Sequence, residues 1–510
     1  MIIDNLNITT KKGRKLIVGL NLLVQEGDKV ALIGEEGNGK STFIKALVNK
    51  DYISSYATVE GNINIEKPIG YLHQFLDHGW DNYCIRDYFL KDNPDSEVDY
   101  DKYNEFSEIA STFHEFGLPA SMLDGDQLIG TLSGGEKVKL QLIKIKQMSP
   151  AIFLFDEPTN DVDIQTLEVI ETFIKKCNVP VIFVSHDETF IENTANMIVH
   201  FEQLKRKNEF HYTVFKGGLK EYELMRKRSQ INQDRIAKAQ ETLYNEKMST
   251  IQRLIDAGAG EKVVRRLVAQ RERLEKKGLP DYVDTESAIG LFFDEVDMPK
   301  SKVVCDLQLN TLSCPDKELS HDIELKVVGP QKVVITGTNG VGKTTLLKEI
   351  YKNVTQKENI KVGYMPQNYS EMMDFEEYPI DFLCPGGNKE QKTFCYTLMG
   401  CCKFTSNEMM HKIGELSGGQ QAKLYILKMV IDKDNCLILD EPTRNLSPMS
   451  NPVIRAILKE YDGAIISVSH DRKYINEVCD HIYSLSESGL KLKMEKSSTD
   501  NVKKNDEITY

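Results

Sequence analysis

The sequence of 510 residues contains no apolar stretch of membrane-spanning length. A helix that crosses a bilayer needs about 20 predominantly apolar residues, whereas runs such as Ala151 to Phe155 and Val181 to Val184 are far shorter. The N-terminus lacks the basic region, apolar core and small-residue cleavage site of an export signal. We therefore expect a cytoplasmic protein with no membrane domain in the chain.

Paired metal-binding cysteines are also missing. None of the ten cysteines belongs to a Cys-x-x-Cys pair, so we expect reduced core thiols rather than a metal site. Positive charge is scarce overall, since the net charge is -13, which argues against non-specific adsorption to nucleic acid by the whole surface. Residues 220–277 are the exception, with 15 Lys and Arg against 9 Asp and Glu.

The length and a composition of 40% apolar and 28% charged residues are typical of a folded chain with two cores. A repeat supports two domains, because three segments recur after the same interval of 284 positions. The pairs are Leu132-Ser-Gly-Gly-Glu136 with Leu416-Ser-Gly-Gly-Gln420, Phe155-Asp-Glu-Pro-Thr159 with Leu439-Asp-Glu-Pro-Thr443, and Val184-Ser-His-Asp187 with Val468-Ser-His-Asp471.

The organisation that follows has two similar halves and a connector. Continuous apolar runs alternate with helical segments in each half, which predicts an α/β fold with a mostly parallel sheet. The predicted boundaries are 1–217 for the first half, 218–280 for a basic helical hairpin, 281–299 for a connector, 300–488 for the second half and 489–510 for a polar tail.

Each half carries a phosphate-binding loop of the pattern G-x-x-x-x-G-K-[ST] between a predicted strand and a predicted helix. Glycines let backbone N–H groups surround phosphates at a helix N-terminus, the lysine reaches the terminal phosphates, and the hydroxyl ligates Mg²⁺. The two loops and the residue after each are Gly34, Glu35, Glu36, Gly37, Asn38, Gly39, Lys40, Ser41 and Thr42, and Gly337, Thr338, Asn339, Gly340, Val341, Gly342, Lys343, Thr344 and Thr345.

Acidic pairs and histidines follow later strands at matching positions in both halves. Asp156 and Asp440 end apolar runs, where a carboxylate can hold Mg²⁺. The adjacent Glu157 and Glu441 point elsewhere and suit the activation of a water molecule. An isolated Asp-Glu is more often a helix cap or a surface pair, but His186 and His470 stand 29 residues after each glutamate and are expected to contact the γ-phosphate.

The segments Leu132 to Glu136 and Leu416 to Gln420 resemble the signature motif of the ABC family of ATPases. The resemblance implies ATP and Mg²⁺ as ligands and two composite sites, in which the signature of one half covers the nucleotide held by the other. It adds Gln74 and Gln367 as ligands of Mg²⁺ and sensors of the γ-phosphate. The first site then combines Lys40, Ser41, Gln74, Asp156, Glu157 and His186 with Ser417, Gly418 and Gly419, and the second Lys343, Thr344, Gln367, Asp440, Glu441 and His470 with Ser133, Gly134 and Gly135.

Two features depart from that family pattern. The segments 9–16 and 310–319 contain no aromatic residue to stack on adenine before either phosphate loop. The aspartate of the family's D-loop is present as Asp163, but Ser447 occupies its place in the second half. The two sites are therefore expected to be unequal, with hydrolysis at both.

The predicted structure of the connector distinguishes among the functions that a tandem ABC ATPase can have. Apolar residues recur at helical spacing from Gly218 to Ala257, break at 258–260 and resume at 261–277, which predicts a helical hairpin. Cassette, basic hairpin and cassette together resemble the ABC-F family, which implies ATP-dependent binding to rRNA and tRNA near the ribosomal exit site, with antibiotic resistance as one outcome. The residues suited to RNA phosphates are Arg265, Arg266, Arg271, Arg273, Lys276 and Lys277.

Three alternatives stay open at this point. The hairpin is either an RNA-binding element or a solvated spacer whose charges keep it soluble. The whole chain is alternatively a tandem ATPase subunit of a transporter, which would require a membrane partner near the Q-loops. A DNA-repair or chromosome ATPase is a third reading, but such proteins usually carry a long coiled coil between the phosphate loop and the signature.

Overall fold

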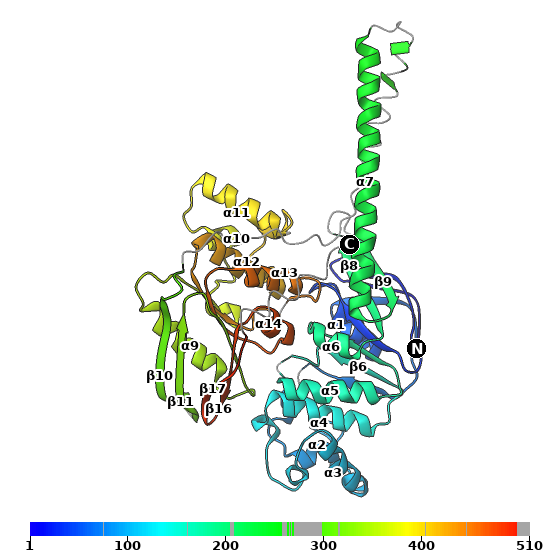
Figure 1. Ribbon diagram of the computed structural model, residues 1–510. Coiled ribbons are helices and arrows are strands. Elements are labelled where there is room, and N and C mark those ends of the chain that lie inside the picture. The colour runs from blue at the N-terminus through cyan, green and yellow to red at the C-terminus, as the bar shows by residue number, and fades with distance from the viewer. Residues whose placement is uncertain are drawn as a thin grey trace.

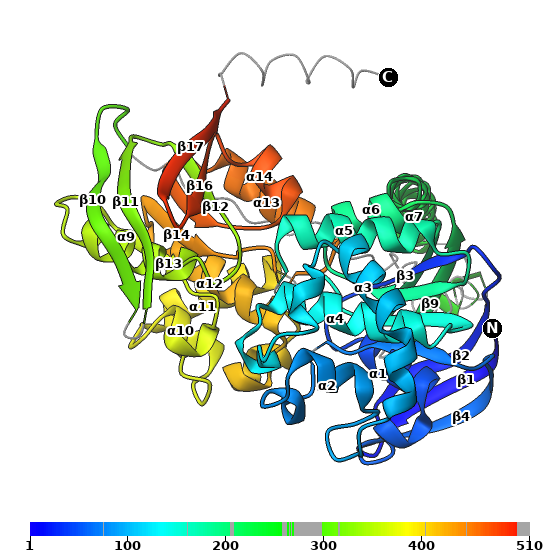
Figure 2. The same ribbon diagram turned by 90° about the horizontal axis from the view of Figure 1, so that it is seen from below.

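The computed structural model contains two α/β halves placed side by side and one long helix that projects from the first half (Figures 1 and 2). It describes residues 1–496 apart from 75, 161, 205–208, 258–262, 265, 267, 270–297, 315–316, 403 and 445. Residues 1–217 form the first half, and the described residues from 298 onward belong to the second half, with Met298 buried in its core.

The first half contains a six-stranded sheet in the order β5-β6-β7-β3-β8-β9 and a three-stranded antiparallel sheet in the order β2-β1-β4. Its strands are β1 (Ile2–Thr10), β2 (Lys15–Leu23), β3 (Lys29–Ile33), β4 (Ala57–Asn64), β5 (Ile69–Leu72), β6 (Ile152–Asp156), β7 (Val181–Val184), β8 (Met197–Leu204) and β9 (Glu209–Lys216). Its helices are α1 (Lys40–Val48), α2 (Ile85–Leu90), α3 (Phe106–Glu115), α4 (Gly134–Gln147), α5 (Ile164–Lys176) and α6 (Glu188–Thr194).

The second half repeats this arrangement, with a six-stranded sheet in the order β13-β14-β15-β12-β16-β17 and a two-stranded antiparallel sheet, β10-β11. Its strands are β10 (Val303–Cys314), β11 (Lys317–Val328), β12 (Lys332–Thr336), β13 (Val362–Met365), β14 (Cys436–Asp440), β15 (Ala464–Val468), β16 (His481–Ser486) and β17 (Gly489–Glu495). Its helices are α9 (Lys343–Thr355), α10 (Pro379–Leu383), α11 (Lys389–Cys401), α12 (Gly418–Asp432), α13 (Asn451–Glu460) and α14 (Arg472–Glu477).

The expected α/β class is confirmed, and burial explains it. Every residue of β3, β6, β7, β14 and β15 is buried, as expected for central parallel strands covered on both faces. One core lies on each face of each six-stranded sheet. Phe43 of α1 packs on the face covered by β1 and β2, and Ile170 of α5 packs on the opposite face.

The predicted end of the second half is wrong. Residues 489–495 were expected to begin a polar tail, but they form β17, the antiparallel edge partner of β16. The polar side chains of Lys491 and Lys493 alternate with Leu490, Leu492 and Met494, and this period of two is the pattern of a β-strand, although Leu492 and Met494 are exposed at this edge of the sheet. The second half therefore extends at least to Glu495.

The predicted first arm of the connector is confirmed as α7 (Leu219–Asp256), a helix of 38 residues that begins after Gly218. It leaves the first half and extends well beyond both halves (Figure 1). Arg266 is exposed and helical. The other five basic residues proposed for RNA binding, Arg265, Arg271, Arg273, Lys276 and Lys277, and the predicted connector as far as residue 297 lie outside the described residues.

No helix within the described part of the chain is both long and apolar enough to cross a membrane. All ten cysteines have free thiols.

Candidate functional site

Each phosphate loop joins a buried strand to a helix, as the sequence predicts. The first connects β3 to α1 and the second connects β12 to α9. Gly39 and Gly342 precede these helices with φ values of 85° and 100°, a backbone region that favours glycine. The free N–H groups of the first helical turn consequently face the loop and form a site for an anion.

The two loop lysines are buried and fold back onto their own loops. Lys40 Nζ donates to the carbonyl oxygens of Gly34 at 2.7 Å and Glu35 at 3.0 Å. Lys343 Nζ makes the equivalent pair of contacts, each at 2.9 Å. Burial lowers the pKa of both amines, while nearby carboxylates oppose that shift. An incoming polyphosphate offers both ammonium groups a stronger partner than a neutral carbonyl.

The strand-end carboxylates point in different directions, as expected. Ser41 Oγ donates to Asp156 Oδ1 at 2.8 Å, so the hydroxyl and carboxylate proposed as Mg²⁺ ligands already meet. Glu157 and Glu441 have φ values of 53° and 52°. This left-handed conformation is strained for a glutamate, and it turns each side chain away from the preceding aspartate.

The two histidines differ in their contacts. His186 Nε2 lies 3.1 Å from Glu157 Oε1, and its Nδ1 lies 3.0 Å from the carbonyl oxygen of Leu446 in the second half. Neither ring nitrogen of His470 has a hydrogen-bond partner among the described residues, and its Nε2 is 3.9 Å from Glu441 Oε1. Within that part of the chain, His186 links its glutamate to the opposite half and His470 does not.

The pKa values of the two glutamates are shifted in opposite directions. Burial raises the pKa of Glu441 to about 7, helped by the charge of Asp440, and burial beside Lys343 lowers the pKa of His470 to about 4. Burial also disfavours the charge on Glu157, but the His186 ring and Lys40 outweigh it and lower its pKa. Glu157 is thus held ionised, whereas Glu441 and His470 do not form an ion pair at neutral pH.

We predict that the two equivalent Glu→Gln changes shift stability in opposite directions when nucleotide and Mg²⁺ are absent. The raised pKa of Glu441 means that its contribution is complete below pH 4.5 and is lost as the pH rises through about 7. Glu441→Gln should therefore raise the free energy of unfolding at pH 8 by about 1–2 kcal/mol. Glu157→Gln should lower it by about 2 kcal/mol, because it removes an ionised partner of His186.

Urea unfolding at pH 8 and pH 5.5, with a chelator present, measures both changes. The gain from Glu441→Gln should shrink at pH 5.5, where the native carboxyl is already protonated. The contribution of Glu157 belongs to the range above its unfolded pKa of 4.5 and is lost only as the pH falls through the lower folded value. A shift of the same sign for both variants at pH 8 would contradict this description.

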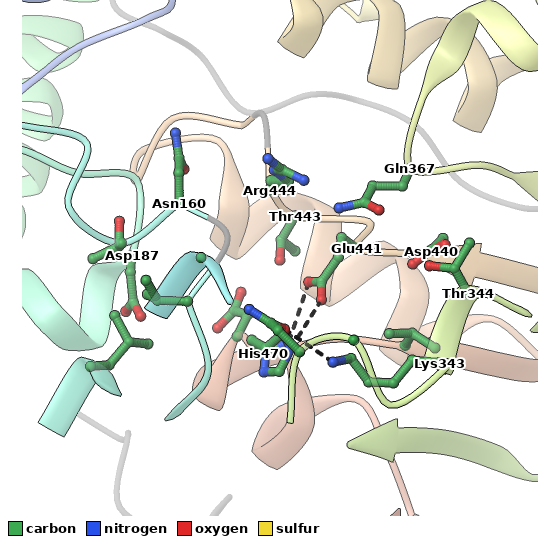
Figure 3. A pocket seen from close by; sticks show the side chains of 18 of the residues that line it. Asn160, Asp187, Lys343, Thr344, Gln367, Asp440, Glu441, Thr443, Arg444 and His470 are labelled. Carbon is green, nitrogen blue, oxygen red and sulfur yellow. Dashed lines mark hydrogen bonds and ion pairs between the residues drawn. The ribbon is translucent and has the colours of Figure 1, made fainter. Parts of the chain in front are cut away.

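Residues from both halves line the larger of the two candidate nucleotide cavities, which has a volume of about 550 Å³. Figure 3 shows Asn160 and Asp187 of the first half across from Lys343, Asp440 and other residues of the second half. The predicted site residues that line it are His186 of the first half, which also lines the smaller cavity, and Gly134, Asn339, Gly340, Gly342, Lys343, Thr344, Thr345, Gln367, Asp440, Glu441 and His470.

The corresponding cavity beside the first phosphate loop is smaller, about 310 Å³. The signature motif of the second half contacts the edge of this cavity, where the backbone N–H of Gly419 donates to Glu36 Oε2 at 3.0 Å. Arg444 reaches this cavity from the second half. The predicted site residues that line it are Glu36, Gly37, Gly39, Lys40, Ser41, Thr42, Gln74, Glu157 and His186.

Some predicted residues do not line either cavity. Among the signature residues, Ser133 and Ser417 cap α4 and α12, where each side chain accepts the backbone N–H three residues later. Gly135 is needed for packing, because a Cβ there would lie 2.7 Å from Thr166 Oγ1. The remaining predicted residues outside the cavity walls are Gly34, Glu35, Asn38, Asp156, Gly337, Thr338, Val341, Gly418 and Gly419.

Sequence reasoning missed several residues of the cavity walls. Leu16 and Leu319 occupy equivalent positions, 303 residues apart, and line the first and second cavity respectively. They supply an apolar surface where an aromatic residue was sought. Asn160 and Arg444 line both cavities, and their matching position after the repeated Pro-Thr was the available signal.

The two D-loops also differ in structure. Asp163 accepts the backbone N–H of Thr166 at 2.9 Å and caps α5. Ser447 does not cap the equivalent helix, which begins at Asn451, and its hydroxyl instead lies 3.1 Å from Ser450 Oγ. The expected inequality between the halves is therefore present in the backbone as well as in the side chain.

Comparisons with known proteins agree with this geometry. The family model described as "ABC transporter" matches residues 17–160 and 320–444, together more than half of the chain. "ABC transporter F family member 5" of Arabidopsis thaliana is 24% identical, over 94% of this chain and 74% of that protein. "Putative ATP-binding protein YdiF" of Bacillus subtilis is 25% identical, over 93% and 78%.

A similar fold occurs in the archaeal ribosome recycling factor aABCE1, solved in complex with the ribosomal stalk protein aP1. The TM-score is 0.55 with 16% identity, and the match covers 92% of this chain and 86% of that chain. This likeness extends across both halves and therefore supports the tandem architecture.

Proposed function

The chain belongs to the ABC transporter family, in which it is of the ABC-F type, and on this basis we propose that its ATPase cycle drives binding to the ribosome and release from it. As a tandem ABC protein the chain binds and hydrolyses ATP.

The residues of the second site fit a bound Mg²⁺. Asp440 Oδ2 is buried and has no hydrogen-bond partner in the part of the chain that the structure describes, which is costly unless a cation or water joins it. Thr344, Gln367 and Asp440 supply hard oxygen ligands of the kind Mg²⁺ prefers, and Ser41, Gln74 and Asp156 are their counterparts in the first site. When bound, Mg²⁺ would neutralise charge on the phosphate oxygens.

The glutamates after these aspartates act as general bases. Glu157 and Glu441 are placed to orient a water molecule for attack and to accept its proton. His186 and His470 hold the γ-phosphate side of each site. The contact between His186 Nε2 and Glu157 Oε1 supports this assignment, because it lowers the pKa of the carboxyl group and fixes its direction.

In this scheme, bound ATP stabilises the closed arrangement of the two halves. The signature helix of each half presents free backbone N–H groups to the phosphates held by the other half, as the contact from Gly419 to Glu36 illustrates with a carboxylate in place of a phosphate. Binding therefore favours the closed pair, and loss of the γ-phosphate removes that preference.

The observation that carries the ribosome assignment is α7. Its 38 residues extend about 57 Å at 1.5 Å per residue, far more than a tether between adjacent halves requires. Basic side chains along it suit RNA phosphates. The exposed ones are Lys220, Lys227, Arg228, Arg235, Lys238, Lys247 and Arg253.

We place this helix and the rest of residues 218–280 against rRNA and tRNA near the exit site, as the family resemblance implies. The similarity in fold to an archaeal ribosome recycling factor is consistent with such a partner. Protection of the ribosome from an antibiotic is one use of binding at that place. A transporter subunit, the alternative reading, gives α7 no role.

Co-sedimentation with ribosomes at physiological salt tests the proposal. The variant Glu157→Gln, Glu441→Gln should pellet with ribosomes in ATP, because its halves close around ATP that it cannot hydrolyse. It should remain in the supernatant in ADP, which does not hold the halves closed. Additional charge reversal at four positions of α7 should abolish pelleting and leave the ATPase activity of the otherwise native chain unchanged. The four changes are Arg228→Glu, Arg235→Glu, Lys238→Glu and Lys247→Glu.

A matched control reverses four exposed lysines outside α7 and should still pellet. The changes are Lys11→Glu, Lys12→Glu, Lys491→Glu and Lys493→Glu. Failure of the ATP-bound Gln variant to pellet would reject the ribosome as the partner. Equal loss of ATPase activity on reversal of the α7 charges would mean that the helix is structural.

A further inference from the structure

The two halves meet through buried ion pairs of uniform polarity. Glu188, at the start of α6, accepts a bidentate pair of hydrogen bonds from Arg455 of α13. Arg455 Nη1 donates to Glu188 Oε1 at 2.6 Å, and Nη2 donates to Oε2 at 3.1 Å. Lys473 Nζ of α14 lies 2.8 Å from the same carboxylate. The side chains of Glu188 and Arg455 are only 2% and 4% exposed, so little solvent screens their attraction.

A second contact lies close by and has the same polarity. Arg472 at the start of α14 donates to Glu171 of α5 and also lies 3.7 Å from Asp187 Oδ2. Lys473 Nζ reaches Glu192 of α6 at 2.6 Å. In each of these cross-half pairs the acid belongs to the first half and the base to the second.

The repeat of the chain shows that these are two copies of one contact. In the repeat, Arg455 stands 284 positions after Glu171, and Arg472 stands 284 positions after Glu188. The pair of Glu188 with Arg455 therefore maps onto the pair of Arg472 with Glu171. The same two positions are used twice, with the charges reversed between the halves.

The residues that orient these side chains follow the repeat as well. Asn193 Nδ2 donates to Glu171 Oε2 at 2.9 Å within the first half. Its equivalent, 284 positions later, is Glu477, whose Oε2 accepts from Arg455 Nε at 2.8 Å within the second half. Each half thus orients its interface charge with a hydrogen bond of its own. The amide of Asn193 orients the acid Glu171, and the carboxylate of Glu477 orients the base Arg455.

We propose that this arrangement is a pairing code, in which the face of each half accepts the opposite half and rejects a copy of itself. Two first halves in the same geometry would place Glu171 against Glu188 twice, and two second halves would place Arg455 against Arg472 twice. Buried like charges that face one another are strongly unfavourable, and such repulsion excludes wrong partners as effectively as attraction selects the right one.

The code fixes the composition of both nucleotide sites. With only unlike halves able to pair, the phosphate loop at Lys40 always meets the signature of the second half, and the loop at Lys343 always meets that of the first. The two unequal sites are therefore formed in every closed molecule. This inference depends on the ATPase activity of the chain and not on the ribosome assignment.

Trans-complementation between two full-length variants tests the code. The first variant, Glu171→Arg, Glu188→Arg, has two basic faces, and the second, Arg455→Glu, Arg472→Glu, has two acidic faces. Each alone should lose at least tenfold in ATPase activity. Mixed together, they should recover activity and sediment as a dimer, because the native second half of the first variant can pair with the native first half of the other.

A mixture no more active than the sum of its components would overturn the proposal, as would full activity of either variant alone. A milder series removes the risk that buried arginine prevents folding. Glu188→Gln and Arg455→Gln should each reduce ATPase activity several-fold, and the double variant should lose no more than the worse single one, whereas independent losses that multiply would contradict the pairing. The control variant Glu115→Lys, Lys146→Glu, an exposed pair within the first half, should remain fully active.

Discussion

Replacing both strand-end glutamates, Glu157→Gln and Glu441→Gln, should reduce steady-state ATP hydrolysis at least about 100-fold, the effect expected when a general base is removed. Glutamine keeps the size of the side chain but cannot accept a proton from water. ATP binding should persist, because the phosphate loops are unchanged. Release of phosphate at saturating ATP measures the first effect, and retention of labelled ATP measures the second.

The control for this prediction changes two exposed glutamates on helices of the same halves. Glu168→Gln on α5 and Glu390→Gln on α11 remove the same charges without touching either cavity. They should hydrolyse ATP at the native rate. Turnover by the Glu157→Gln, Glu441→Gln variant within tenfold of the native rate would show that these carboxylates are not the general bases.

The change Gly34→Ala should eliminate ATP binding at the first site. Gly34 has a φ of 142°, and a Cβ at this position would lie 2.3 Å from the carbonyl oxygen of Phe201 in β8. Backbone strain and overlap with backbone together cost about 3 kcal/mol, and the phosphate loop must move to relieve them. Equilibrium binding should show one ATP fewer per chain.

Gly37→Ala is the matched control in the same loop. Gly37 also has a positive φ, 79°, but nothing lies within 4 Å of a Cβ placed there. It should retain ATP binding with a smaller loss of stability, since it suffers strain without overlap. Undiminished binding by Gly34→Ala would mean that the loop tolerates displacement and that its contact with β8 does not support the site.

Features with a local chemical cause could be predicted from the sequence. The phosphate loops need glycine at particular positions, and the signature glycines stand at the start of a helix that needs a cap. Each requirement produces a recognisable pattern within a few residues of the sequence. The buried strands and the 38-residue α7 likewise follow from local runs and periodicity.

Features that depend on the approach of the two halves could not be predicted in this way. Glu188 and Arg455 are 267 positions apart, and each alone resembles an ordinary helix charge. The contrast between Glu157 and Glu441 arises because His186 meets the backbone of Leu446 across the interface, whereas His470 has no such contact among the described residues. The same Asp-Glu-Pro-Thr segment therefore acquires oppositely shifted glutamate pKa values from tertiary contacts.

In this mechanism one chain forms two nucleotide sites, each completed by both of its halves. Counting the ATP molecules retained by the Glu157→Gln, Glu441→Gln variant, together with the mass of the species that retains them, tests this arrangement. We expect two ATP molecules on a monomer of 58.1 kDa. Retention of a single ATP, or retention only by a dimer, would contradict it.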